Sequence, residues 1–257
     1  LTAQGYRPPR LEEDLREVEK DTQAIARAMN AGDYGAAARW VEELTADSQR
    51  ALTGAQEWVE LHKRNEEALR IMREEADQVA AYQANEAAPA WKKLQTYPRG
   101  NWKDIADDVA QATETLQTLR DDVLDRIARL NSLEEQKFAA AEQLLDQALA
   151  DLAQAEGQLQ AVVDRLAEVQ EAEKHIQKAL QQTEAALTKA ETFRDKEDVK
   201  IGPKVDKQIE KAHRLLDKAR RLAKERNFLA AEKAQAEARE LATAAYASAS
   251  EQVREIN

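Results

Sequence analysis

The chain of 257 residues has no cysteine, seven glycines, five prolines and only 5% aromatic residues. The lack of cysteine excludes disulfides, zinc–thiolate sites and thiol catalysis. No apolar run reaches the roughly eighteen residues of a membrane-spanning helix, and there is no signal-peptide pattern. The abundant residues are Ala, Leu, Glu, Gln, Lys and Arg, which is the composition of long helices and coiled coils.

One pattern recurs four times: an aromatic residue followed, at three, ten and seventeen positions, by small or aliphatic residues. The four aromatic residues are Tyr34, Trp102, Phe138 and Phe228. The residues that follow them are Ala37, Leu44, Ala51, Ile105, Ala112, Leu119, Ala141, Ala148, Ala155, Ala231, Ala238 and Ala245. A step of seven keeps one stripe facing a partner helix. The sequence therefore predicts an all-α protein, an elongated array of long antiparallel helices.

Breaks in the pattern divide the chain. Residues 1–10, with two prolines, form a lead-in linker. We expect a first bundle over 11–96 and a second, longer one over 101–257. The expected helices cover about 11–29, 33 to a break at 61–65, 65–95 with an interruption at Pro89, 102–130, 138 to a turn at 168–173, 176–193, 203–226 and 228–256.

Several turns carry recognisable cap residues. Gly32 ends one helix and Asp33 caps the next. Asn101 and Asn227 are expected to cap the helices that follow them. Ser132 and Glu135 stand three apart, as in a capping box. The stretch Lys200-Ile201-Gly202-Pro203 marks a break, because proline suits the first turn of a helix.

These turn and core residues resemble the helical region that follows the TPM domain in some bacterial membrane proteins. The resemblance rests on Asn101-Trp102-Lys103-Asp104-Ile105, Asn131-Ser132-Leu133-Glu134-Glu135-Gln136-Lys137-Phe138-Ala139-Ala140-Ala141, Gly32-Asp33-Tyr34 and Val199-Lys200-Ile201-Gly202-Pro203. The antiparallel layout is also similar to spectrin-type repeats, including those of the bacterial septation-ring regulator, although their tryptophan pattern is not kept. The fold it implies is a set of spectrin-like helical bundles.

The resemblance implies a bacterial protein that is tethered to a membrane, with a cytoplasmic helical part. Because the chain begins with Leu1 rather than methionine, we expect the tether to lie in segments outside it. Arg7 and Arg10 would suit the cytoplasmic edge of a membrane span.

Signals for catalysis are weak. Glu210 and His213 match one Glu-x-x-His element, but a di-iron bundle needs two such elements and two more glutamates. Adjacent carboxylates such as Asp107 and Asp108 point in different directions on a helix and are expected to be hydrated. No phosphate loop, serine nucleophile motif or metal cluster is found. We expect no enzymatic activity, no metal and no cofactor.

The clearest local departure from the acidic average is the basic stretch from Lys204 to Arg226. Its candidate interaction face consists of Lys204, Lys207, Lys211, Arg214, Lys218 and Arg221. This face could dock on an anionic membrane surface or an acidic protein. It could equally pair with neighbouring acidic helices, and the sequence favours this internal pairing because basic helices usually rest on nearby carboxylates.

The formal net charge of -11 argues against nucleic acid as a partner. The favoured function is a non-catalytic structural spacer or protein-interaction rod, with a protein partner that the sequence does not name. Two alternatives stay open: a scaffold of the septation or cytoskeletal type that assembles as a homo-oligomer, and a bundle that binds a ligand or metal in its core.

Overall fold

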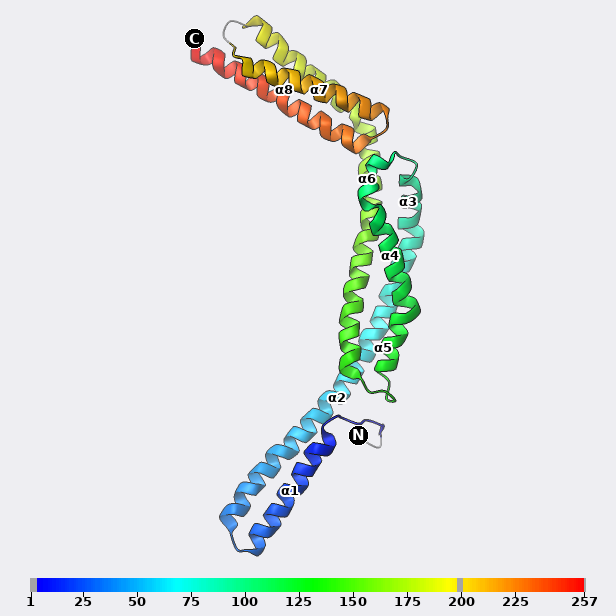
Figure 1. The fold of residues 1–257 in the computed structure, drawn as a ribbon, viewed down its shortest axis with the longest axis vertical. Helices are drawn as coiled ribbons and strands as arrows, with labels where there is room; N and C mark the ends of the chain where they lie inside the picture. The colour runs from blue at the N-terminus through cyan, green and yellow to red at the C-terminus, as the bar shows by residue number, and fades with distance from the viewer. Residues whose placement is uncertain (1–3, 198–200, 257) are drawn as a thin grey trace. The chain divides into compact units, whose positions relative to one another are not determined.

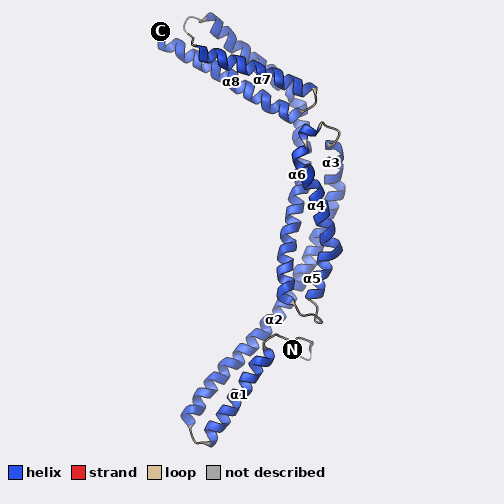
Figure 2. Cartoon of the chain, in the orientation of Figure 1, coloured by secondary structure: helices blue, strands red, loops and turns tan. Residues whose placement is uncertain are grey.

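A computed structural model describes residues 4–197 and 201–256, and within these ranges it contains helices and no strands (Figures 1 and 2). The α-helices are α1 (Leu11–Asn30), α2 (Tyr34–Tyr82), α3 (Ala88–Leu94), α4 (Ala106–Thr118), α5 (Leu124–Leu130), α6 (Phe138–Lys196), α7 (Pro203–Lys224) and α8 (Phe228–Ile256). Short turns connect antiparallel neighbours. The predicted all-α fold of packed long helices is confirmed.

The chain forms two compact units. Unit 1 comprises Leu1–Ala80 and Thr113–Ala155, and unit 2 comprises Ala81–Ala112 and Glu156–Asn257. In unit 1, the first half of α2 pairs with α1 and its second half packs beside α5 and the start of α6 (Figure 1). In unit 2, the end of α6 packs against α7 and α8. Each unit therefore combines residues from both of the stretches that the sequence suggested.

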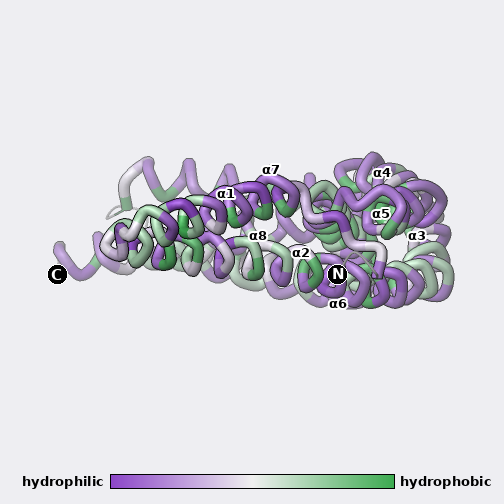
Figure 3. The backbone as a smooth tube through the Cα atoms, turned by 90° about the horizontal axis from the view of Figure 1, so that it is seen from below, coloured by the Kyte–Doolittle hydropathy of each residue, from purple (hydrophilic) through white to green (hydrophobic). Residues whose placement is uncertain are grey.

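The seven-residue stripe forms the core, as predicted. Of the twelve positions that follow the four aromatic residues, Leu44 is half-buried and the others are buried. Besides Phe228 and Gln235, the buried residues of α8 are all alanine: Ala231, Ala234, Ala238, Ala242, Ala245 and Ala249. Hydrophobic residues accordingly alternate with hydrophilic ones along the helices (Figure 3). Small side chains allow close backbones but bury little area each, so stability is spread over many layers.

The same type of backbone turn connects the two helices of the α1–α2 hairpin and of the α7–α8 hairpin. After α1, the Gly32 N–H donates to the Met29 carbonyl (3.1 Å) and the Asp33 N–H to the Ala28 carbonyl (2.9 Å). After α7, the Arg226 N–H bonds Ala223 (3.0 Å) and the Asn227 N–H bonds Leu222 (2.8 Å). This is the Schellman arrangement, in which the first turn residue has a positive φ, here 73° at Gly32 and 60° at Arg226. An aromatic residue then begins the next helix in both hairpins.

Two predicted interruptions are wrong. The helix does not break at 61–65, because α2 continues through Asn65, whose side chain is buried and hydrogen-bonded. No turn occurs at 168–173, since α6 is continuous there. Neither region contains glycine or proline, and strong helix formers propagate a helix unless something stops it.

The interruption at Pro89 is confirmed. A π-helical turn at Gln83–Ala87 precedes α3, and Pro89 lies in the first turn of α3. Proline lacks the N–H that an unbroken α-helix would use at this point. The widened turn absorbs that mismatch.

The expected caps are met in part. Asp33 caps α2 through the Ala36 N–H (2.8 Å), and Pro203 is the first residue of α7. Asn101 does not cap the helix after it, because its side chain is used elsewhere in unit 2. Ser132 does bind the Glu135 N–H (3.2 Å), but α6 begins only at Phe138, so the pair stabilises a turn.

Asn227 precedes α8, but its side-chain Oδ1 is buried without a hydrogen bond, so it is not a side-chain cap. Lys200, in the predicted break before Pro203, lies outside the described residues. Among the helices that the structure describes, none combines the length and the apolar character required to cross a membrane.

Candidate functional site

Six exposed basic side chains form one line along α7. Lys204, Lys207, Lys211, Arg214, Lys218 and Arg221 recur at every third or fourth residue. The buried residues of α7 pack into the core with α6 and α8: Val205, Ile209, Ala212, Leu216, Ala219 and Ala223. Helical geometry places the basic line on the side of α7 away from that core. We call it the α7 cationic stripe.

The predicted pairing with neighbouring helices occurs beside the stripe rather than on it. Arg220 reaches Glu184 of α6 (2.6 Å) and Arg226 approaches Glu173 of α6 (3.9 Å). Within the stripe, Arg214 pairs with Glu210 of its own helix. The other five stripe residues form no ion pair with any carboxylate in the described part of the chain. Their charges are therefore available to a partner.

The Glu-x-x-His element is split between two interactions. The ring of His213 hydrogen-bonds Glu191 of α6 (2.5 Å), and Glu210 pairs with Arg214. Both side chains are substantially exposed. Within residues 4–197 and 201–256, no group of three or more potential ligands is arranged to hold a metal ion. His213 thus contributes a contact between α6 and α7, whereas Glu210 pairs within α7.

Unit 1 contains a buried polar joint that the sequence analysis missed. Asn65 Nδ2 donates to Asn131 Oδ1 (3.0 Å) and to the Phe138 carbonyl (2.8 Å), and Asn131 Nδ2 donates to the His62 carbonyl (3.1 Å). The His62 ring stacks on Phe138 at 4.8 Å, and Trp58 packs on Phe138 at the same centroid distance. The hydrogen bonds of the two asparagines fix one packing register. Beside them, Trp58 Nε1 and His62 Nδ1 are buried without a hydrogen-bond partner among the described residues.

The lead-in linker packs onto this joint. The Arg7 N–H donates to Gln136 Oε1 (2.7 Å), and Gln136 Nε2 donates to the carbonyls of Gly5 (2.8 Å) and Leu133 (2.8 Å). Tyr6 meets the Phe138 ring edge-on at 6.4 Å. The linker is thereby attached to the turn before α6.

Unit 2 contains a second buried joint, centred on Asn101. Its Nδ2 donates to the Arg226 carbonyl (3.0 Å) and its Oδ1 accepts the Leu229 N–H (3.3 Å). Gly100 is part of the same fit, because a Cβ there would lie 2.2 Å from the Asn227 Oδ1. Asn101 therefore holds the turn between α7 and α8 from outside.

Ionisable groups reinforce the unit 2 joint. Burial, followed by a hydrogen bond to Glu173 (2.8 Å), raises the pKa of the Tyr97 phenol. Arg226 lies over the Tyr97 ring at 5.1 Å. Arg165 makes two hydrogen bonds to the Asp104 carboxylate (2.8 and 3.0 Å) and holds the pKa of that carboxyl below its ordinary range. These contacts position helices.

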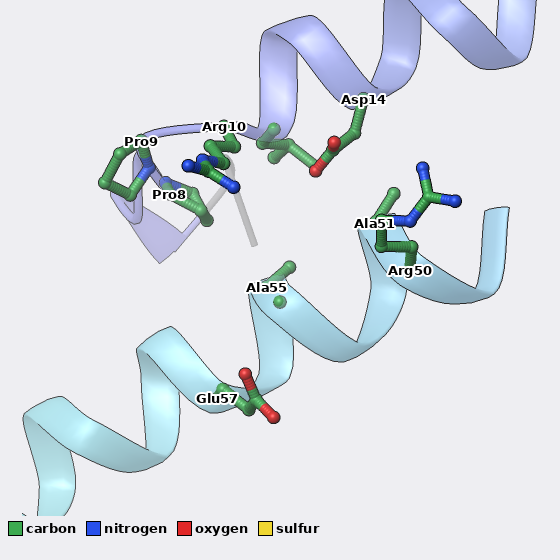
Figure 4. Close-up of a pocket in the computed structure, with 10 residues that line it drawn as sticks. Pro8, Pro9, Arg10, Asp14, Arg50, Ala51, Ala55 and Glu57 are labelled. Carbon is green, nitrogen blue, oxygen red and sulfur yellow. The ribbon is translucent and has the colours of Figure 1, made fainter. Parts of the chain in front are cut away.

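A cavity of about 360 Å³ lies between the lead-in and the α1–α2 hairpin (Figure 4). Arg10, Asp14, Arg50 and Glu57 line it, together with Pro8, Pro9, Leu11, Ala51, Gly54 and Ala55. Two cations and two carboxylates balance each other there. The cavity has mixed charge and no histidine or hydroxyl nucleophile in its lining.

Comparison of the chain with protein-family models, curated proteins and solved structures finds no match. Functional assignment therefore depends on the surfaces and joints described above. Among them, the α7 cationic stripe is the exposed surface that the sequence predicted as an interaction face, and its six residues all carry positive charge.

Proposed function

We propose that this chain is a non-catalytic helical interaction module that binds an acidic protein partner through the α7 cationic stripe. The observation that carries the proposal is the contrast between Arg220, which pairs with Glu184, and five stripe residues that have no ion pair in the described chain. An acidic partner would supply the missing carboxylates. Opposed charged surfaces steer association and favour the correct register.

A protein is favoured over a membrane surface because α7 has no apolar side to insert. Its aliphatic residues, from Val205 to Ala223, are already buried in the core of unit 2. Helices that lie in a bilayer interface bury an apolar face in the lipid. The stripe could attract lipid by charge alone, without inserting into it.

The polar joints support the spacer part of the proposal. Asn65 and Asn131 fix one joint, and Asn101 fixes the other. A docking helix held in one register presents its charges with fixed spacing, which lowers the entropy cost of binding. Unit 2, in which Asn101 holds the turn between α7 and α8, then acts as a rigid support for the stripe.

Binding to immobilised poly-L-glutamate tests the stripe. The variant Lys207→Gln/Lys211→Gln/Lys218→Gln should bind several-fold more weakly than wild type, and added salt should abolish the difference. The matched control, Lys92→Gln/Lys93→Gln/Lys103→Gln, removes the same charge from exposed residues of unit 2 and should retain binding. Equal losses in the two variants would show a general charge effect and defeat the proposal. Stripe-dependent sedimentation with phosphatidylserine vesicles, without peptide binding, would favour the membrane surface instead.

The resemblance to TPM-domain proteins extends the proposal to a membrane-tethered bacterial protein with a cytoplasmic helical part. Arg7 and Arg10 in the lead-in are consistent with this placement. The sequence of the full gene and fractionation of the full-length protein test it. A full-length protein without a membrane span, recovered entirely in the soluble fraction, would contradict the tether.

A further inference from the structure

One side of the α1–α2 hairpin is poor in charge, with Glu19 at its outer edge. Its residues lie just beside the seam between the two helices, and all are exposed: Leu15, Thr22, Ala26, Met29, Tyr34, Ala38, Val41, Thr45, Ser48 and Leu52. We call this surface the uncharged flank. The opposite side of the same hairpin carries Glu13, Glu17, Lys20, Arg27, Arg39, Glu43, Arg50 and Glu57. In a chain with 34% charged residues, this segregation needs a physical reason.

Large apolar side chains on the flank are unusually open to water. Leu15, Met29, Tyr34, Val41 and Leu52 are 48% to 70% exposed, and they make up five of the eight exposed large hydrophobic residues in the described chain. Within unit 1, α1 and the first half of α2 stand as a pair, without a third helix beside them (Figure 1). Contiguous exposed apolar surface of this kind marks an interaction site.

The flank residues of α1 and those of α2 lie on the same side of the hairpin because the two helices are antiparallel. On each helix, the flank residues follow the buried seam in the same rotational sense. For α1 the seam includes Val18 and Ile25, and for α2 it includes Ala37 and Ala51. When one helix of a pair is reversed, these residues fall on the same side of the pair. Leu15, Thr22 and Met29 therefore join Tyr34, Val41 and Ser48 in one continuous surface.

Two of the four hydroxyls on the flank are already hydrogen-bonded within their own helices. The Thr22 hydroxyl donates to the Val18 carbonyl (2.8 Å), and the Thr45 hydroxyl donates to the Val41 carbonyl (2.7 Å). Hydroxyls that are already hydrogen-bonded lose little when water is removed. These two threonines can thus be covered by an apolar partner at small cost.

We propose that the uncharged flank binds the same flank of a second copy of this chain, so that two hairpins close into a four-helix bundle. The α1 helix of 20 residues is about 30 Å long, and two helices side by side are about 20 Å wide. Each copy would then cover about 600 Å², and the total of about 1,200 Å² meets the lower size of a stable interface. A symmetric contact needs no other surface, since the flank is its own apolar complement.

The helix dipoles favour one orientation of the two copies. An antiparallel arrangement of the two α1 helices opposes their dipoles. Leu15 then lies opposite Met29 of the second copy, and the two Val41 side chains lie near the symmetry axis.

Mass measurement by light scattering across a concentration series tests the contact. Wild type should approach twice 28.9 kDa as concentration rises. The variant Val41→Glu/Leu52→Glu should raise the dimer dissociation constant by about a hundredfold or more, since each buried carboxylate costs at least about a factor of ten. Ala46→Glu/Thr53→Glu adds the same charge at exposed positions of α2 beside Glu43 and Arg50, away from the flank, and should leave the dimer intact.

Three results overturn the proposal: a wild-type mass that stays at one chain at every concentration, a dimer that survives Val41→Glu/Leu52→Glu, and equal loss in both double variants. Circular dichroism of each variant checks that helix content is unchanged. A covalent test follows from the lack of cysteine. On mild oxidation, Val41→Cys should give a disulfide-linked dimer and Ala46→Cys should not. The stripe variant Lys207→Gln/Lys211→Gln/Lys218→Gln should dimerise like wild type, so this contact and the proposed function fail separately.

Discussion

The α1–α2 and α7–α8 hairpins close with the same backbone turn, but an aromatic residue after that turn has opposite surroundings. Tyr34, which begins α2, is 70% exposed, whereas Phe228, which begins α8, is 6% exposed. The difference comes from the end of α6, which packs on α7 and α8 as a third helix. The α1–α2 pair has no such cover within unit 1 (Figure 1). Turn chemistry therefore makes the hairpin, and a third helix decides which residues become core.

A second difference lies in what holds each turn. The α7–α8 turn is bound from outside by Asn101, which contacts the Arg226 carbonyl and the Leu229 N–H. The α1–α2 turn is held by its own cap, from Asp33 to the Ala36 N–H. In addition, the ion pairs of the α1–α2 hairpin that the structure describes lie within single helices. The covered hairpin is thus tied to its neighbours in several ways, and the open one is available for a partner.

The largest expected difference between the two hairpins is the loss of stability when the aromatic residue after the turn is replaced by alanine. Phe228→Ala deletes a buried ring and should lower the free energy of unfolding by about 3–5 kcal/mol. Tyr34→Ala, at an exposed site, should change it by less than about 0.5 kcal/mol. Urea unfolding followed by circular dichroism, in dilute solution, measures both. Similar losses in the two variants would mean that α1 and α2 already bury Tyr34 in solution.

The next largest expected difference in stability comes from the side chains that hold each turn. Asn101→Ala leaves the Arg226 carbonyl and the Leu229 N–H without their partner and should cost about 2 kcal/mol. Asp33→Ala removes one exposed cap and should cost about 1 kcal/mol. The same unfolding assay applies, and Asn101→Asp is a control that keeps the acceptor but loses the donor. If Asp33→Ala proved the costlier change, the outside support of the α7–α8 turn would be unimportant.

The left-handed residue of each turn should respond in opposite directions. Arg226→Gly relieves a side chain held at φ 60° and should stabilise the protein by about 0.5–1 kcal/mol, after the loss of its contact with Tyr97. Gly32→Ala introduces a Cβ at φ 73° and should destabilise by about 1 kcal/mol. Thermal unfolding detects both shifts. A destabilising Arg226→Gly would show that the side-chain contacts of Arg226 outweigh its backbone strain.

Local sequence signals predicted the helices and the inner stripe well, because a seven-residue step repeats regardless of neighbours. Ala231, Ala238 and Ala245 are all buried as that step requires. The two mistaken breaks came from expecting short helices, although no glycine or proline stands at 61–65 or 168–173. Helix length follows from tertiary packing, which a local pattern does not contain.

The joints and the free surfaces were harder to predict, for a physical reason. Asn65 and Asn131 are 66 positions apart, and nothing in the residues around either one indicates the other. From its local sequence alone, an asparagine predicts a helix cap or a turn, and Asn101 was predicted to be a cap for this reason. The basic line on α7 was visible in the sequence. Whether acidic neighbours neutralise it depends on which helix lies beside α7, and that is a property of the fold.

The smallest expected effect comes from the ion pair between Asp104 and Arg165 of α6, which joins two elements. The ion pairs described in the α1–α2 hairpin lie within single helices. Asp104 has its pKa lowered mainly by hydrogen bonds from Arg165 of α6. A carboxyl with a lowered folded-state pKa stabilises the protein above its ordinary pKa of about 4, and this contribution is lost as pH falls through the lower, folded-state value. Asp104 is more than half exposed, so the effect should stay below about 1 kcal/mol.

Comparing Asp104→Asn with wild type between neutral pH and about pH 3 measures this contribution. The stability gap should be largest near neutrality and should close as the solution becomes acidic, because wild type then loses the same charge. Glu17→Gln, which breaks an exposed pair with Lys20 on α1 (3.0 Å), is the matched control and should show almost no gap at any pH. A pair within one helix and a pair between elements differ in what they restrain. If Glu17→Gln gave the larger gap, charge ties between elements would not distinguish the covered bundle from the open hairpin, and apolar burial alone would account for the contrast.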